Sequence, residues 1–288
     1  MPPAASEPTT HDGSSGSGHS AGRHAALASG PTVTWLGHAT AVAELGTAAR
    51  PCRVVFDPLL PWRARAAGKV DAVLVTHSHV DHLNRWSLKA IDRDCHLVVP
   101  AGAKHIVADL GFRQVSELTA GQELAIGDLE VTAVPTRHDF GRWRKGGTPE
   151  ALGYVVRGGG VTLHHAGDVD FSEHAVFDAI GKRHTIDAAL LPIGGMLPVW
   201  YYRWRRHVMD GGIHIDPDCA LDIFERLGAR HLIPIHWGTV HLPFSTLASP
   251  RRRLVKIAAA RGKIDQIRVL GHGEGLGLGP QQAQTTPL

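Results

Sequence analysis

A dense run of histidines directly after a buried strand constrains this chain more than any other feature of its sequence. Residues 76–82 read Thr-His-Ser-His-Val-Asp-His, and the apolar run at residues 71–76 is typical of a strand covered on both faces. Because side chains alternate along an extended chain, His77 and His79 are expected on one side, where two imidazoles can hold one ion. The Asp-His pair that ends the run can face a second ion. The sequence therefore predicts a metal site.

Further candidate ligands follow other predicted strands at the point where each strand ends. Residues 131–135 lead into His138, residues 161–163 lead into a His-His-Ala-Gly-Asp run that ends at Asp168, and residues 231–235 lead into His236. Strand ends that meet at one sheet edge are where open α/β folds build their sites. Each of these residues taken alone could equally be structural, so the prediction depends on their meeting the 76–82 segment.

The chain is predicted to form one folded domain between two tails. Residues 1–30 are rich in Gly, Ser, Ala, Pro and His without periodicity and read as a disordered tail, residues 31–275 as the folded body, and residues 276–288 as a flexible C-terminal tail. Hairpins alternate with strand–helix units, which favours an α/β sandwich of two sheets with helices outside. Helices are predicted at residues 84–91, 104–110, 218–227 and 250–261, and a last strand at residues 266–269.

Composition excludes several other classes of protein. A net charge of +3 in 288 residues is too small a bias to indicate nucleic-acid binding. The three cysteines are far apart, which disfavours a disulfide framework or a zinc ribbon. Neither a signal peptide nor a stretch of transmembrane length is visible, so the cytoplasm is the expected location, with peripheral membrane contact left open.

The whole set of motifs resembles the metallo-β-lactamase superfamily over nearly all of residues 31–275. The His-x-His-x-Asp-His loop specifies the superfamily. Other motifs resemble the branch of N-acyl-phosphatidylethanolamine phospholipase D and ascorbate-6-phosphate lactonase, namely Trp-Leu-Gly-His-Ala-Thr at 35–40, Pro-Thr-Arg-His at 135–138, Leu-Pro-Ile-Gly at 191–194, His-Ile-Asp-Pro at 214–217 and His-Trp-Gly-Thr at 236–239. The resemblance implies an αββα sandwich of two mixed β-sheets flanked by helices.

The resemblance also implies a role for each ligand. His77, His79 and His138 would bind the first ion, Asp81, His82 and His236 the second, and Asp168 would bridge both. The two ions are expected to be Zn²⁺, with Mn²⁺ or Fe²⁺ as alternatives. No expected ligand is missing.

Three further residues are predicted to act around these ligands. Asp57 ends a strand before a proline and could orient a ligand histidine, although a turn-forming role is equally open. His214 is predicted to act in catalysis near the reacting or leaving group, although it could instead cap the helix that follows it. The ligand Asp81 is the other predicted catalytic residue, and it would hold or accept the proton of the attacking water. His38 could line the site.

The predicted chemistry is hydrolysis by a hydroxide that bridges two divalent ions. The first hypothesis is a phosphodiesterase similar to N-acyl-phosphatidylethanolamine phospholipase D. A lactonase or other acyl hydrolase of the ascorbate-6-phosphate lactonase type and a non-hydrolytic metal-binding sensor are the alternatives. No Gly-x-Ser-x-Gly elbow is present, which disfavours covalent catalysis.

Two segments bear on the nature of the substrate. Aromatic residues alternate with arginines at residues 196–206, and residues 142–145 read Arg-Trp-Arg-Lys. Such segments suit a lipid interface or an anionic, apolar substrate, or they pack on the body as an internal or dimer contact. The expected partner is therefore a small-molecule or lipid-like substrate, with membrane contact through 196–206 and a homo-oligomer left open.

Overall fold

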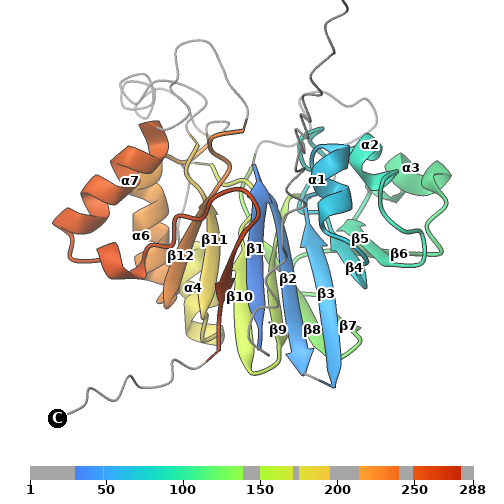
Figure 1. Ribbon diagram of the computed structural model, residues 1–288, viewed down its shortest axis with the longest axis horizontal. Coiled ribbons are helices and arrows are strands. Elements are labelled where there is room, and N and C mark those ends of the chain that lie inside the picture. Colours follow the sequence, from blue (N-terminus) through green and yellow to red (C-terminus); the bar gives the residue numbers. More distant parts are fainter. Residues whose placement is uncertain are drawn as a thin grey trace, which may run out of the picture.

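A computed structural model describes residues 30–47, 49–138, 150–170, 175–194, 214–239 and 249–279. Two mixed β-sheets lie face to face in these residues, and helices cover the outer face of each sheet (Figure 1). This is the αββα arrangement that the sequence predicts.

The first sheet has the strand order β13-β1-β2-β3-β4-β5-β6. Neighbours are antiparallel from β13 to β3 and parallel from β3 to β6. Its strands are β1 (Thr32–Gly37), β2 (Thr40–Thr47), β3 (Arg50–Phe56), β4 (Ala72–Leu74), β5 (His96–Pro100), β6 (Gln114–Leu118) and β13 (Glu274–Gly277).

The second sheet has the strand order β12-β11-β10-β9-β8-β7. The neighbours from β7 to β10 are antiparallel, whereas β10, β11 and β12 are parallel. Its strands are β7 (Glu123–Ile126), β8 (Leu129–Pro135), β9 (Leu152–Gly158), β10 (Val161–His165), β11 (Ala188–Pro192) and β12 (His231–Ile235).

Each sheet has its own set of helices, and three apolar clusters hold the layers together. Beside the first sheet lie α1 (Pro61–Ala66), α2 (Arg85–Leu88), α3 (Lys104–Val107) and the short 3₁₀ helix η1 (Ala108–Leu110) (Figure 1). Beside the second sheet lie α4 (Ala175–Arg183), α6 (Pro217–Leu227), α7 (Ser249–Ala260) and the short 3₁₀ helix η2 (Ile264–Gln266). One buried cluster fills the space between the sheets, around Trp35, Phe56 and Tyr154. The other two lie between each sheet and its helices.

Helix α6 shows how the sequence fixes one wall of the site. Asp216 caps the helix by accepting a hydrogen bond from the backbone N–H of Cys219 at 2.9 Å, and Pro217 occupies the first turn. Gly228 ends the helix in the left-handed conformation that glycine adopts without strain. The capped helix holds the residues before it, including His214, whose backbone forms a β-bridge with Asp170.

Several element boundaries differ from those predicted. Residues 276–278, predicted as tail, belong to the body: β13 pairs with β1 and Leu278 is buried. The strand predicted at residues 266–269 is wrong, since Ile267 forms only an isolated bridge to Leu232. The helix predicted at residues 84–91 is reduced to α2. The Glu-Gly-Leu-Gly sequence of β13 has little strand propensity, so its pairing with β1 makes it a strand.

Three other predictions fall outside the described residues, namely the tail at residues 1–29 and the aromatic and basic segments at 142–145 and 196–206. Among the residues that are described, no helix is long and apolar enough to cross a membrane.

Candidate metal centre

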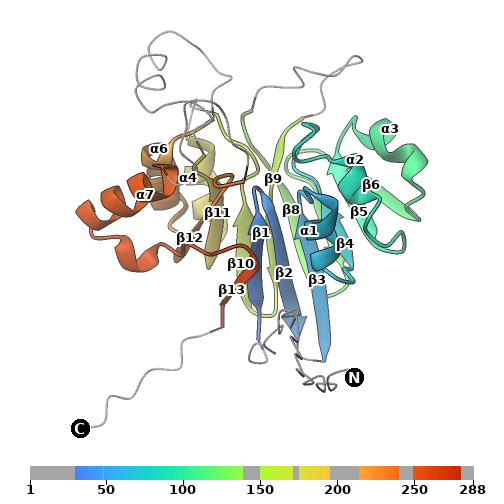
Figure 2. The same ribbon diagram turned by 45° about the horizontal axis from the view of Figure 1, so that its top comes forward.

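The predicted ligands meet where strands of both sheets end at one edge. The chain leaves β4 into the 76–82 segment, while His138, Asp168 and His236 follow β8, β10 and β12. His38 lies in the turn between β1 and β2. This edge is uppermost in Figure 1, where β1 ends, and comes forward in Figure 2. All seven residues that the resemblance assigns as ligands are brought together here.

The site residues form two clusters, in each of which the possible ligand atoms lie within 4.8 Å of one another. The first cluster consists of His77, His79, His138 and Asp168, and the second of His38, Asp81, His82 and His236. Asp168 also groups with His214 and His236, so it lies between the two clusters.

In the first cluster, histidines surround the Asp168 carboxylate. The distance from Asp168 Oδ2 is 3.8 Å to His77 Nε2 and 3.7 Å to His138 Nε2. A ring nitrogen of His79 lies 3.0 Å from His138 Nε2. Two imidazole nitrogens this close to each other and to a carboxylate form an arrangement that a shared cation would stabilise.

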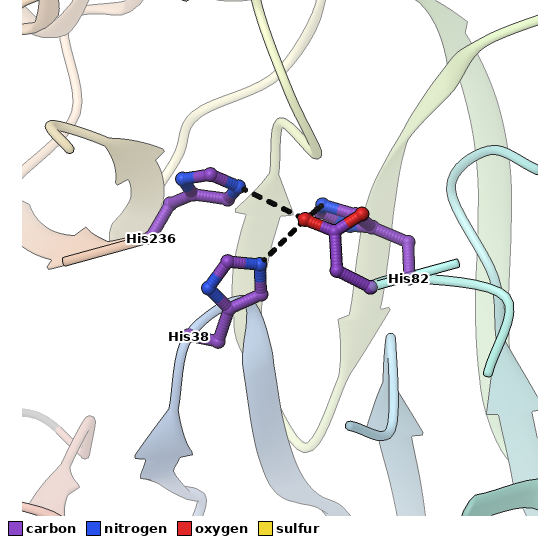
Figure 3. Close-up of side chains that lie close together, drawn as sticks. His38, His82 and His236 are labelled. Carbon is purple, nitrogen blue, oxygen red and sulfur yellow. Dashed lines mark hydrogen bonds and ion pairs between the residues drawn. The ribbon is translucent and has the colours of Figure 1, made fainter. Parts of the chain in front are cut away.

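In the second cluster, one oxygen of Asp81 is at the centre. Asp81 Oδ2 lies 3.0 Å from His38 Nε2, 3.8 Å from His82 Nε2 and 3.7 Å from His236 Nε2 (Figure 3). Asp168 reaches the same histidines from the other side, with Oδ2 3.2 Å from His82 Nε2 and Oδ1 3.3 Å from His236 Nε2.

Buried hydrogen-bond acceptors fix the orientation of three histidine rings. His82 Nδ1 donates to Asp57 Oδ2 at 2.7 Å. His77 Nδ1 donates to Thr76 Oγ1 at 3.0 Å, and this hydroxyl donates in turn to Asp57 Oδ2 at 2.7 Å. Asp57 is fully buried and therefore orients His82 directly and His77 through Thr76, as the sequence predicted for a ligand histidine.

His138 has an equivalent partner in Asp170. Its Nδ1 donates to Asp170 Oδ1 at 2.9 Å, and both side chains are buried. Neither Asp170 nor the role of the Thr76 hydroxyl was predicted from the sequence. A signal was present, because Asp170 lies two residues after Asp168 in a segment that follows a strand end. In each case the Nδ1 atom is engaged, so the Nε2 atom is left for a ligand.

Seven buried polar atoms of the site residues have no hydrogen-bond partner. They are Nε2 of His77, His79, His82 and His236, Nδ1 of His214, and both carboxylate oxygens of Asp168. Burying so many unpartnered polar atoms is costly unless something satisfies them. Divalent cations would satisfy all of these lone pairs at once, so the donor set fits metal binding. Among the described residues, these clusters contain only nitrogen and oxygen donors.

Electrostatics divide the histidines into two groups. Burial, and the nearby ring of His82, hold the pKa of His77 well below its usual value. Burial also lowers the pKa of His79. Burial acts in the same direction on His236, yet the carboxylates of Asp168 and Asp81 outweigh it and raise its pKa to about 9. The pKa of His82 is likewise raised, against burial, by Asp168, Asp57 and Asp81.

His214 lies at the centre of the site as predicted, and its catalytic role stays a prediction. Its Nδ1 is 3.3 Å from Asp168 Oδ2, and its ring lies 4.9 Å from that of His138 and 5.0 Å from that of His236. Burial lowers the pKa of His214 to about 4, so the ring is neutral at pH 7. His164 and His165 belong to neither cluster, and His165 donates to the backbone oxygen of Ala39.

Comparisons with known proteins agree with this geometry. A family model described as a beta-lactamase superfamily domain matches residues 49–237. A UPF0173 metal-dependent hydrolase of Methanopyrus kandleri is 31% identical over 218 residues, which cover 72% of this chain and 84% of that protein. The mitochondrial N-acyl-phosphatidylethanolamine-hydrolyzing phospholipase D of Saccharomyces cerevisiae is 28% identical over 262 residues, 81% of this chain but only 53% of the yeast protein.

The fold also resembles that of solved structures. The structure of Igni18, a metallo hydrolase of the archaeon Ignicoccus hospitalis, superposes with a TM-score of 0.62 and 20% identity, covering 85% of this chain and 97% of that one. At this level of identity the likeness concerns the fold alone.

Proposed function

The chain belongs to the metallo-β-lactamase superfamily, and from that premise we propose that it hydrolyses a phosphodiester with two divalent ions held by the two clusters. That it is a metal-dependent hydrolase follows from its family and its relatives. The number of ions and the phosphodiester are the proposal. It is carried by Asp168, a buried carboxylate between the two clusters whose oxygens both lack a hydrogen-bond partner.

We assign His77, His79 and His138 to the first ion, Asp81, His82 and His236 to the second, and Asp168 to both. Imidazole and carboxylate donors without thiolate suit Zn²⁺, and Mn²⁺ and Fe²⁺ are the alternatives. When bound, two such ions would supply an activated water at neutral pH and polarise a phosphoryl oxygen.

Two side chains would handle protons and the substrate. The side chain of Asp81 is 31% exposed, whereas that of Asp168 is 1% exposed, so Asp81 faces the mouth of the site. Although burial acts in the opposite direction, the neighbouring His82 and His236 rings and the hydrogen bond from His38 hold the pKa of Asp81 below its usual value. The carboxylate is therefore ionised and can hold the attacking water by accepting its hydrogen bond. His214, with an unpartnered Nδ1, would contact the reacting phosphoryl group or the leaving group.

Exposed apolar side chains on α1, on α2 and in the His-rich loop support a lipid-like substrate. Trp62, Val80 and Trp86 are exposed by 62%, 63% and 77%, and Val80 lies within the His-rich loop itself. Beside Trp86 is a surface cavity of about 360 Å³, lined by Pro61, Arg65, Trp86, Lys89 and Ala90. Exposed tryptophans beside basic residues are suited to a membrane interface, so we propose a cytoplasmic enzyme that meets its substrate at an anionic membrane surface.

A parallel assay of two substrate classes tests the proposal. Metal-loaded protein is given a bis-aryl phosphodiester, N-acyl-phosphatidylethanolamine in vesicles, and a lactone. We expect turnover of the phosphodiesters and loss of that turnover in His79→Ala. Turnover of the lactone alone would replace the proposal with the acyl-hydrolase alternative, and absence of any turnover by protein with two bound ions would favour a sensor.

A further inference from the structure

His38 occupies the second cluster although the family resemblance gives it no ligand role. It lies in the β1–β2 turn and is 3% exposed. Its Nε2 is 3.0 Å from Asp81 Oδ2 (Figure 3). Because an ionised carboxylate can only accept a hydrogen bond, Nε2–H is the donor. His38 is thus the direct hydrogen-bond donor to a carboxylate that faces His82 and His236 as well.

The turn that carries His38 is bound to the segment that carries His236. We call these two segments, residues 35–38 and 236–239, the clasp. The backbone oxygen of His38 accepts hydrogen bonds from the backbone N–H of His236 and from Trp35 Nε1, both at 2.9 Å. The backbone N–H of His38 donates to Thr239 Oγ1 at 2.8 Å, across 201 positions of sequence.

Ring contacts join the two segments of the clasp at two places. The rings of Trp35 and Trp237 stack with centroids 5.1 Å apart and planes at 17°. The rings of His38 and His236 lie 4.0 Å apart. These contacts fix where the two histidines point, independently of any bond within the cluster.

Backbone conformation indicates that this arrangement serves the site. His38 and His236 both have left-handed backbone, with φ of 54° and 59°. Such conformations are disfavoured for residues other than glycine and persist only where the surroundings hold them, most often at functional sites. Both strained residues of the clasp direct an imidazole towards Asp81.

We propose that His38 is a positioning residue for the second ion: its Nε2–H sets the orientation of the Asp81 carboxylate, and the clasp sets His236 opposite it. This rests on the proposed two-ion function. Hydrogen-bond partners of metal ligands contribute about 10–100-fold to metal affinity, so the effect should fall on the second ion and spare the first.

A pair of substitutions separates positioning from direct ligation. His38→Asn tolerates the left-handed backbone but is too short to reach Asp81. His38→Gln places an amide N–H near the position of Nε2 and keeps the donor. His272→Asn is the matched control, because the His272 ring lies against Trp35 of the clasp, with centroids 4.8 Å apart, but His272 belongs to neither cluster.

The readout is metal binding itself, measured in two steps by competition with a chromophoric chelator, together with the absorption spectrum of the Co²⁺-loaded protein. We expect His38→Asn to weaken the second step about 10–100-fold and to change the Co²⁺ spectrum, with the first step unchanged. His38→Gln should restore the second step to within a few-fold of the wild-type protein, and His272→Asn should match the wild-type protein. Thermal unfolding of the metal-free variants checks that each is folded.

Each other outcome overturns the proposal in a distinguishable way. A second step in His38→Asn equal to that of the wild-type protein would show that His38 positions nothing. Equal loss in the Asn and Gln variants would make His38 a direct ligand instead. Failure of the proposed function itself would appear in the wild-type protein, as the absence of any second step.

Discussion

The two clusters of the metal centre share the His-rich loop but take their other residues from different parts of the chain. The first joins the His-rich loop to the ends of β8 and β10, and its outer acceptor Asp170 follows closely after Asp168. The second joins that loop to the β1–β2 turn and the end of β12, which are far apart in the sequence. It also includes two residues with left-handed backbone, His38 and His236. The comparison indicates that the first cluster depends on strand ends and the second on closure of the clasp.

The largest effect is expected where the two clusters meet. Asp168→Asn removes the one carboxylate shared by both, so we expect loss of both ions and a fall in turnover beyond the roughly 100-fold that outer residues can cause. Metal analysis by mass spectrometry and phosphodiesterase assays measure the two effects. Asp187→Asn is the control, since Asp187 accepts a backbone bond from Thr162 and belongs to neither cluster. Two ions retained in Asp168→Asn would contradict the shared role.

The next largest difference between the two clusters is expected in the pH dependence of their metal binding. In the metal-free protein the pKa of His236 is about 9 and that of His82 is raised, whereas those of His77 and His79 are lowered. Below about pH 9 an ion entering the second cluster must therefore displace a proton, whereas the pKa values of His77 and His79 in the first cluster lie below their usual value. We expect the second binding step to weaken about 100-fold from pH 8 to pH 6 if one proton is displaced, and the first step to weaken less.

Stepwise metal titrations at several pH values measure this difference. His105→Asn, a histidine outside both clusters, should follow the wild-type profile. A parallel decline of both steps with falling pH would remove the electrostatic distinction between the clusters.

Asp170 and Asp57, the carboxylates that accept hydrogen bonds from ligand histidines, allow the metal affinities of the two clusters to be changed separately or together. Asp170 accepts a hydrogen bond from His138 of the first cluster, so Asp170→Asn should weaken the first step about 10–100-fold and leave the second within a few-fold. Asp57 orients His82 directly and His77 through Thr76, so Asp57→Asn should weaken both steps. Chelator competition resolves the steps. If Asp170→Asn weakened both steps equally, the two clusters could not be treated as separately supported units.

The sequence predicted most of the first cluster because its information is local. Alternation places His77 and His79 together, and strand ends point to His138 and Asp168. Asp57 was also recognisable, because an Asp-Pro pair at the end of a strand is a place where a side chain can turn back towards the site. The assignment of each residue to an ion, including the shared role of Asp168, came from the family resemblance and stays a proposal.

One member of the second cluster, His38, was harder to predict because its place in the site depends on contacts with residues far away in the sequence. His38 lies in a short turn, and no spacing rule connects it to Thr239, 201 positions away. The same reason explains β13, a Gly-rich segment that becomes a strand only by pairing with β1. Trp35, which donates to His38, was visible only as part of a motif and not as a structural contact.

The smallest expected effect tests the clasp through a residue outside the cluster. Trp35→Phe keeps an aromatic ring against Trp237 but removes the hydrogen bond to the backbone oxygen of His38. That oxygen still accepts from His236, so we expect a loss of about 1 kcal/mol in the free energy of unfolding of the metal-free protein. The second binding step should weaken a few-fold because the turn becomes looser.

Tyr154→Phe is the matched control for this change. The Tyr154 hydroxyl donates to the backbone oxygen of Val75 at 2.8 Å, so its removal also costs one buried hydrogen bond, about 1 kcal/mol, but outside the clasp. Urea denaturation measures the stability of both variants, and metal titration measures the two steps. Similar stability losses with a second step weakened only in Trp35→Phe would locate the effect in the clasp. Equal weakening of the second step in both variants would mean that general stability, rather than the clasp, governs how the second cluster holds its ion.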